Sequence, residues 1–261
     1  MHYLFIFIIG LAIGSFLNVL IVRVPKNENV ITPASHCPVC KKRLKPWHNI
    51  PLISWILLKG SCAYCKTPIS KMYPVVELIT GLIFLFVSFK EGLTVEWFII
   101  SLIFSLLFAL SIIDFKYYAV PDSLNFVALI LALLLPLFIF IEDYLTQNLQ
   151  NFTNYQNMII ANFKDATIMA VSLFLLGFII KKIIKKDALG EADIIIAATM
   201  GAMLGFPSVL MAIYVAALLA IVPAILAHNH MVPFVPFLAL GTLIVYFFND
   251  TFLIWWERFY A

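Results

Sequence analysis

Long apolar runs separated by short polar segments dominate the pattern of this chain. The runs cover residues 3–22, 73–89, 95–113, 123–141, 166–180, 194–227 and 234–256. A helix needs about 20 mostly apolar residues to cross the roughly 30 Å hydrocarbon core of a bilayer, and most of these runs approach that length. The pattern therefore predicts an all-α polytopic membrane protein.

The longest run, residues 194–227, predicts two helices. As one helix, its 34 residues would extend about 51 Å, which is too long for a single crossing. Pro207 lies near its middle, where it cannot donate the hydrogen bond that would continue a helix. Dividing the run there gives about eight transmembrane helices. The first run could instead be a signal peptide, but no Lys or Arg precedes it and it exceeds an h-region of about 7–15 residues.

Basic residues are concentrated on one side of the predicted membrane. If the N-terminus lies outside, the cytoplasmic segments are 23–72, 114–122, 181–193 and 228–233, and they hold 14 of the 17 Lys and Arg residues. Cytoplasmic loops carry such an excess, so this distribution supports both the orientation and the even number of helices. The segment 142–165 is then expected to be a polar external loop.

The composition narrows the class of protein. The chain is 63% hydrophobic and 12% charged, with a mean hydropathy of +1.02. Soluble domains are about 45–50% apolar and about 25% charged, so a soluble domain is excluded, as are a disordered chain and a small disulfide scaffold. A net charge of +3 is too small to indicate a nucleic-acid partner. The expected environment is membrane lipid.

All four cysteines lie in the segment 23–72, as two Cys-x-x-Cys pairs with 21 residues between them: Cys37, Cys40, Cys62 and Cys65. Four thiolates at this spacing can surround one tetrahedral Zn²⁺, as in structural zinc ribbons. A site closed by four protein ligands leaves no position for a substrate, so the metal would stabilise the loop. Two disulfides are the alternative, although a cytoplasmic loop keeps its thiols reduced. A different thiolate-bound metal and a metal-free reduced site also remain open.

Two acidic residues stand at predicted cytoplasmic ends of membrane helices. Asp114 follows the run 95–113, and Asp193 precedes Ile194. Ionisable groups at such positions are costly and are therefore candidates for function. Two facing carboxylates can share a proton, so that one acts as a base on water while the other polarises a carbonyl, as in aspartic proteases. Ordinary helix-end acids are the alternative, and this alternative suits Asp193 better, because the helix dipole disfavours an acid at a C-terminus.

Other acids and other classes of protein remain to be weighed. Asp122 and Asp187 resemble ordinary helix caps, and Glu191 is ambiguous. Acids in membrane helices also build ion paths, so an ion or solute transporter or channel is the main alternative, but it would need acids near the bilayer midplane. A zinc-ribbon interaction protein that uses its helices only as an anchor is a third possibility.

Several ordered motifs resemble those of the prepilin peptidases, also called type IV leader peptidases, which are integral-membrane aspartic proteases. They cover nearly the whole chain and lie at residues 14–25, 35–40, 48–55, 60–65, 73–77, 114–122, 190–193 and 232–241. Two positions depart from the family pattern. Ala192 replaces the second glycine of the Gly-x-Gly that precedes the second aspartate, and Val235 replaces the glycine of Pro-Phe-Gly-Pro-Phe.

The resemblance implies a specific enzyme of the bacterial inner membrane. It implies that Asp114 and Asp193 are catalytic, with Asp122, Glu77 and Gly190 in supporting roles. The substrates would be type IV prepilins and the pseudopilins of secretion systems, cleaved at the junction between a short basic leader and an apolar helix on the cytoplasmic side. Many members also methylate the new N-terminus with S-adenosylmethionine, an activity associated with the cysteine-bearing loop.

These inferences divide the chain into three parts. Residues 1–22 are expected to form the first transmembrane helix, and residues 23–72 a cytoplasmic, zinc-ribbon-like loop. Residues 73–261 are expected to form the transmembrane aspartic peptidase core.

Overall fold

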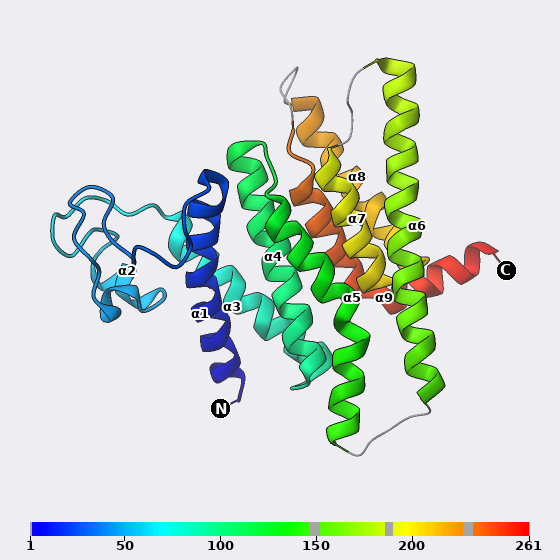
Figure 1. The fold of residues 1–261 in the computed structure, drawn as a ribbon, viewed down its shortest axis with the longest axis horizontal. Helices are drawn as coiled ribbons and strands as arrows, with labels where there is room; N and C mark the ends of the chain where they lie inside the picture. Colours follow the sequence, from blue (N-terminus) through cyan, green and yellow to red (C-terminus); the bar gives the residue numbers. More distant parts are fainter. Residues whose placement is uncertain (1, 147–151, 186–189, 227–231, 261) are drawn as a thin grey trace. The chain divides into compact units, whose positions relative to one another are not determined.

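The computed structural model describes residues 2–146, 152–185, 190–226 and 232–260. In these residues the regular structure is helical, apart from two isolated bridges in the cysteine-bearing loop (Figure 1). This confirms the predicted all-α class. The chain divides into two compact units, residues 1–93 (unit 1) and residues 94–261 (unit 2).

Unit 1 is built on two helices that pack closely along each other, α1 (His2–Arg23) and α3 (Met72–Glu91). The approach is so close that a Cβ placed on Gly14 would lie 2.7 Å from the Cα of Glu77. Between these helices the chain forms three short helical turns: η1 (Val24–Lys26), η2 (Pro46–Asn49) and α2 (Ile53–Leu57). Helix α3, which the sequence analysis placed in the peptidase core, packs on α1 within unit 1.

Unit 2 contains six described helices: α4 (Val95–Tyr117), α5 (Asp122–Leu145), α6 (Phe152–Ile184), α7 (Glu191–Leu204), α8 (Ser208–Leu226) and α9 (Val235–Tyr260). Helix α4 is the most enclosed of the candidate membrane helices, and it packs against α5 and α9. Helix α7 packs against α6 and α5, and α8 packs against α9. The helices that carry Asp114 and Asp193, α4 and α7, thus pack against helices from separate parts of the sequence.

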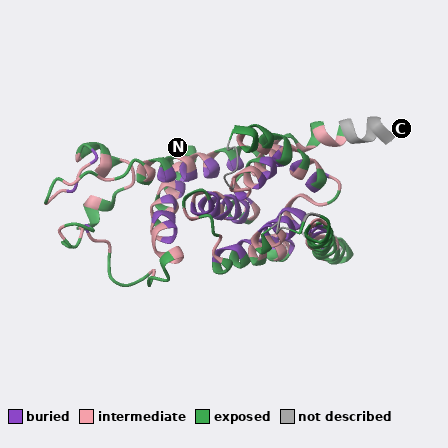
Figure 2. Ribbon diagram, turned by 90° about the horizontal axis from the view of Figure 1, so that it is seen from above, coloured by how far each residue is buried: buried purple, intermediate pink, exposed green. Residues whose placement is uncertain are grey.

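Seven described helices are long and apolar enough to cross a membrane: α1, α3, α4, α5, α6, α8 and α9. Many residues of these helices are exposed (Figure 2). Many of these exposed residues are large and apolar, as contact with lipid requires. The predicted break near Pro207 is confirmed, since α7 ends at Leu204 and α8 begins at Ser208. The remaining predicted crossing, α7, has only 14 residues and is about 21 Å long at 1.5 Å per residue.

The predicted external loop at 142–165 is largely wrong. Helix α5 continues to Leu145, and α6 already begins at Phe152, so most of the described part of this segment is helical. Polar residues such as Asn and Gln lower hydropathy but are compatible with a helix. The low hydropathy of this segment therefore concealed the first four turns of α6, including Asn162 and Asp165.

Candidate active site

Asp114 lies in the last turn of α4 and is buried, with 8% of its surface exposed. The helix ends there because Tyr118 adopts a left-handed conformation and donates its N–H to the carbonyl of Asp114. The side chain of Asp114 accepts a hydrogen bond from the backbone N–H of Val235, with an N···Oδ2 distance of 3.2 Å. Because Val235 is the first residue of α9, this bond ties the end of α4 to the start of α9.

Asp193 lies in the first turn of α7 and is equally enclosed, with 9% of its surface exposed. Its Oδ2 accepts the backbone N–H of Gly190, the residue before the helix, at 3.1 Å. This is the position at which the helix dipole favours an acid. Gly190 contributes its N–H and has a φ of −78°, which other residues also adopt, so its backbone donor is the relevant feature.

The two carboxylates belong to the same unit, and they are close enough for the charge of Asp114 to act on Asp193. Asn125, in the first turn of α5, donates its side-chain N–H to the carbonyl of Ala192 at 3.0 Å and so ties α5 to the start of α7. In the described residues, each carboxylate has only Oδ2 in a hydrogen bond. The Oδ1 atoms therefore remain available to other hydrogen-bond partners.

The two departures from the family pattern lie at residues that act through their backbones. Val235 supplies an N–H to Asp114, and Ala192 supplies a carbonyl to Asn125. Both groups are present whatever the side chain is. The replacement of the family glycines is therefore compatible with the same local hydrogen bonds.

Two nearby acids differ from this pair in exposure. Asp122 is the first residue of α5 and is exposed, at the helix end where an acid is favourable. Glu191 is also exposed, in the same turn of α7 as Asp193. A supporting role for Asp122 stays a prediction. The third acid considered from the sequence, Asp187, lies outside the described residues.

The four cysteines of unit 1 form one cluster. Their Sγ atoms all lie within 4.8 Å of one another, and Cys37 and Cys65 are 3.7 Å apart. Around a zinc ion with Zn–S bonds of about 2.3 Å, tetrahedral geometry places the sulfurs ~3.8 Å apart. The four residues are free thiols, so the two-disulfide alternative is wrong. The cluster therefore fits a structural metal ion, and Zn²⁺ is the ion that such a ligand set favours.

The two Cys-x-x-Cys turns repeat the same backbone geometry. Cys37 and Cys62 each accept, on their carbonyls, the N–H of the lysine that follows the second cysteine of the pair. These lysines, Lys41 and Lys66, have φ values of 55° and 59°, in the left-handed region. The repeated turn points the sulfurs of both pairs toward a common centre.

Hydrogen bonds favour ionised sulfur at two of the four positions. The hydroxyl and then the backbone N–H of Thr67 lower the pKa of Cys65 to about 6. The backbone N–H groups of Cys40 and Val39 lower the pKa of Cys37. At Cys40, the backbone N–H of Lys42 lowers the pKa. Burial and the hydrogen bonds with the other three sulfurs raise it and outweigh that effect, so the pKa is about 11. A divalent ion that binds all four thiolates must therefore displace a proton from Cys40.

Glu77 belongs to unit 1, whereas Asp114 and Asp193 both belong to unit 2. Its carboxylate accepts the backbone N–H of Leu52 at 2.8 Å and a hydrogen bond from Ser15. Leu52 has a φ of 58°, so Glu77 holds a left-handed turn of the loop. These contacts assign Glu77 to anchoring the loop on α1 and α3. A supporting role of Glu77 in catalysis stays a prediction.

Sequence reasoning missed several polar residues that the structure places inside unit 2. Asn125, Asn162 and Asp165 all lie on membrane helices. The two asparagines hydrogen-bond to backbone groups of other helices, and Asp165 to the backbone of the α7–α8 connection. Asp165 is the only one with an ionisable side chain, and its 8% exposure matches that of Asp114. The detectable signal was an acid directly before the apolar run 166–180, which the loop assignment obscured.

Comparison with known proteins agrees with this architecture. Residues 8–91 match the bacterial peptidase A24 N-terminal domain, and residues 101–225 match the type IV leader peptidase family. A prepilin leader peptidase/N-methyltransferase of Neisseria gonorrhoeae is 30% identical, and the match covers 94% of this chain and 90% of that relative. The chain belongs to the type IV leader peptidase family. No solved structure matches it.

Other relatives of this leader peptidase differ in length. A Bacillus subtilis prepilin leader peptidase/N-methyltransferase is 29% identical, with 94% of each chain covered. One from Myxococcus xanthus is 33% identical over 79% of this chain, which spans only 57% of that relative. The two matched domains meet where units 1 and 2 divide. Membership of this aspartic peptidase family confirms the predicted enzyme class and displaces the transporter and anchor alternatives.

Proposed function

We propose that this leader peptidase removes the short basic leader from type IV prepilins and pseudopilins, with Asp114 and Asp193 as its catalytic carboxylates. The observation that carries the proposal is that unit 2 holds two buried acids, each held by one backbone N–H, that are close enough for one charge to act on the other. Such a pair is unfavourable as a structural feature, because two enclosed negative charges repel each other. It is suited to sharing one proton.

The proposed reaction uses the two carboxyls in different protonation states. The ionised one takes a proton from a water molecule as its oxygen attacks the scissile carbonyl, and the protonated one donates a hydrogen bond to the carbonyl oxygen. Collapse of the tetrahedral intermediate then breaks the C–N bond, and a carboxyl delivers a proton to the leaving amine. Because the two carboxyls share one proton during the reaction, the two acids act as one unit.

The proposed location of the site is the cytoplasmic face of the bacterial inner membrane. The substrates have a basic leader followed by an apolar helix, and basic segments remain on the cytoplasmic side. The exposed apolar flanks of the unit 2 helices offer a surface on which the substrate helix can lie. The distribution of Lys and Arg supports the same orientation for this chain, with both termini outside.

Methyl transfer from S-adenosylmethionine is a second part of the proposal, and it rests on the names of the relatives. Unit 1 has a cavity of about 700 Å³ beside α1, in whose described lining Arg23, Arg43 and Lys45 are the charged residues. These bases suit the carboxylate of S-adenosylmethionine. No acid in this lining complements its ammonium and sulfonium groups. The cavity alone therefore does not account for methyl transfer.

Co-expression with a prepilin tests the proposed function. Mass spectrometry of the pilin N-terminus should show loss of the leader, and a further 14 Da (about one methyl group) would report methylation in the same spectrum. An uncleaved prepilin, in cells where the protein is present in the membrane, would contradict the proposal.

The N–H of Val235 offers a sharper test of the geometry. Val235→Pro removes this donor at the first residue of α9, where a helix tolerates proline. A hydrogen bond to a charged group contributes about 1.5–3 kcal/mol, so the rate of leader cleavage should fall about 10- to 100-fold. Val235→Ala keeps the N–H and should cleave like the parent. Equal rates for both variants would show that this bond does not matter.

A further inference from the structure

Three breaks in backbone pairing meet inside unit 2, at the level of the α7–α8 connection. Pro136 in α5 has no N–H, so the carbonyl of Ala132 loses its helical partner. Helix α7 ends at Leu204, so the carbonyl of Ala202 and the N–H of Phe206 do not form the hydrogen bond that a continuing helix would place between them. Within a bilayer, unpaired backbone groups of this kind cost several kcal/mol each.

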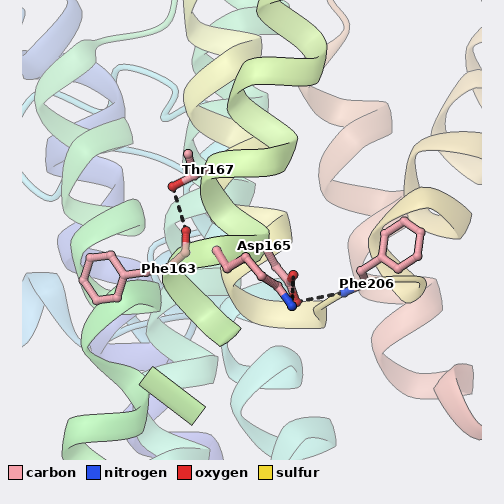
Figure 3. Close-up of polar contacts among 5 residues, drawn as sticks. Phe163, Asp165, Thr167 and Phe206 are labelled. Atoms are coloured by element: carbon pink, nitrogen blue, oxygen red, sulfur yellow. Dashed lines mark hydrogen bonds and ion pairs between the residues drawn. The ribbon is translucent and has the colours of Figure 1, made fainter. Parts of the chain in front are cut away.

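Two residues of α6, one turn apart, satisfy all three groups. The side-chain amide of Asn162 donates to the carbonyl of Ala132 at 3.1 Å and to that of Ala202 at 2.8 Å. The carboxylate of Asp165 accepts the N–H of Phe206 at 3.2 Å, and Figure 3 shows it reaching from α6 to that residue. Asn162 and Asp165 are named here the α6 clamp.

The α6 clamp lies where α6 and α7 approach each other closely. A Cβ placed on Gly201 would lie 2.7 Å from the backbone oxygen of Asp165 and 2.9 Å from Met169 Cγ. Helix α7 is thus fixed at both ends, by the α6 clamp near Leu204 and by Asn125 at Ala192. Asp193 lies in the first turn of this short helix, so any shift or tilt of α7 displaces its carboxylate.

We propose that Asn162 and Asp165 are positioning residues, which hold α7 so that Asp193 faces Asp114. The proposal rests on the function proposed above. It assigns Asp165 the role of a hydrogen-bond acceptor through Oδ2, while the ion pair of its Oδ1 with the exposed Lys164, at 3.6 Å, is not part of the α6 clamp. This separates it from an acid of an ion or proton path, in which the ionisable group itself is required.

The test compares Asp165→Asn, which keeps an acceptor oxygen, with Asp165→Ala, which does not. In purified protein, kcat and KM for prepilin cleavage are measured beside hydrogen exchange of residues 191–204. Asp165→Ala should lower kcat about 10- to 100-fold with little change in KM, because a small misplacement of a catalytic group can cost ~100-fold. It should also speed exchange in α7. Asp165→Asn should keep the parent kcat and exchange.

A matched control removes another hydrogen bond of α6. The hydroxyl of Tyr155 donates to Asp143 at 2.6 Å, and this contact does not involve α7. Tyr155→Phe should therefore leave kcat and exchange of α7 unchanged. If Asp165→Ala does not accumulate, Asn162→Ala removes both amide donors and should give the same pair of changes.

Three results would overturn the proposal: an inactive, folded Asp165→Asn, a parent-like Asp165→Ala, or an equal loss of kcat in Tyr155→Phe. Failure of the parent protein to cleave prepilin would instead refute the proposed function. The exchange of α7 would still report whether the clamp holds the helix.

Discussion

Asparagine at either Asp114 or Asp193 is expected to abolish leader cleavage, with a loss of about 1,000-fold or more, as for other residues that act as one catalytic unit. The replacement keeps the size of the side chain and an oxygen that can accept the N–H of Val235 or Gly190. It removes only the exchangeable proton and the charge. Both variants should therefore remain folded in the membrane, as measured by detergent extraction and thermal unfolding, while prepilin accumulates uncleaved.

Glu191→Gln is the matched control for this experiment. Glu191 is exposed and lies in the same turn of α7 as buried Asp193, so it tests whether any loss of charge there is harmful. It should keep most of the cleavage activity. If Asp193→Asn cleaved at nearly the parent rate, the catalytic partner of Asp114 would have to be sought at Glu191 or Asp122.

Loss of one cysteine is expected to remove the metal and unfold the loop of unit 1. The purified protein should contain one Zn²⁺ per chain, and Cys62→Ser should contain none. Structural zinc sites contribute about 10–16 kcal/mol, which is comparable with the whole stability of a domain. The loop should therefore become sensitive to protease. Methylation, if present, should fall more than leader cleavage, because the acid pair lies in unit 2.

Ser61→Ala controls for the presence of a substitution beside the cluster. Its hydroxyl donates to the carbonyl of Leu58 at 2.7 Å and is not a metal ligand. This variant should retain one zinc and a protected loop. Four freely alkylated thiols in the native parent protein, together with the absence of stoichiometric metal, would contradict the assignment.

The features predictable from the sequence were those with a strong local signal. Apolar length located most of the membrane helices, and Gly205 and Pro207 located the break between α7 and α8. The paired Cys-x-x-Cys spacing located the thiol cluster. Asp114 and Asp193 stood out because ionisable groups are rare at the ends of apolar runs.

The remainder depends on packing between helices, which local patterns do not contain. Gly14 is an ordinary residue of an apolar run until α3 lies against it, and that contact moves α3 into unit 1. Asp165 reads as a loop residue because polar neighbours precede it, whereas its carboxylate receives the N–H of Phe206, 41 residues away. The donor to Asp114 is the N–H of Val235, which lies 121 residues away in the sequence. Because it is a backbone group, the type of side chain at this position does not reveal it.

The account rests most heavily on Asp114 and Asp193 working as a single unit. The direct measurement is kcat/KM for leader cleavage by purified Asp114→Asn, Asp193→Asn and the double variant. Each single variant should lose nearly all activity, and the double variant should be no worse than either, because the shared proton is already lost. A double variant whose loss equals the product of the two single losses would show independent contributions and contradict the proposed pair.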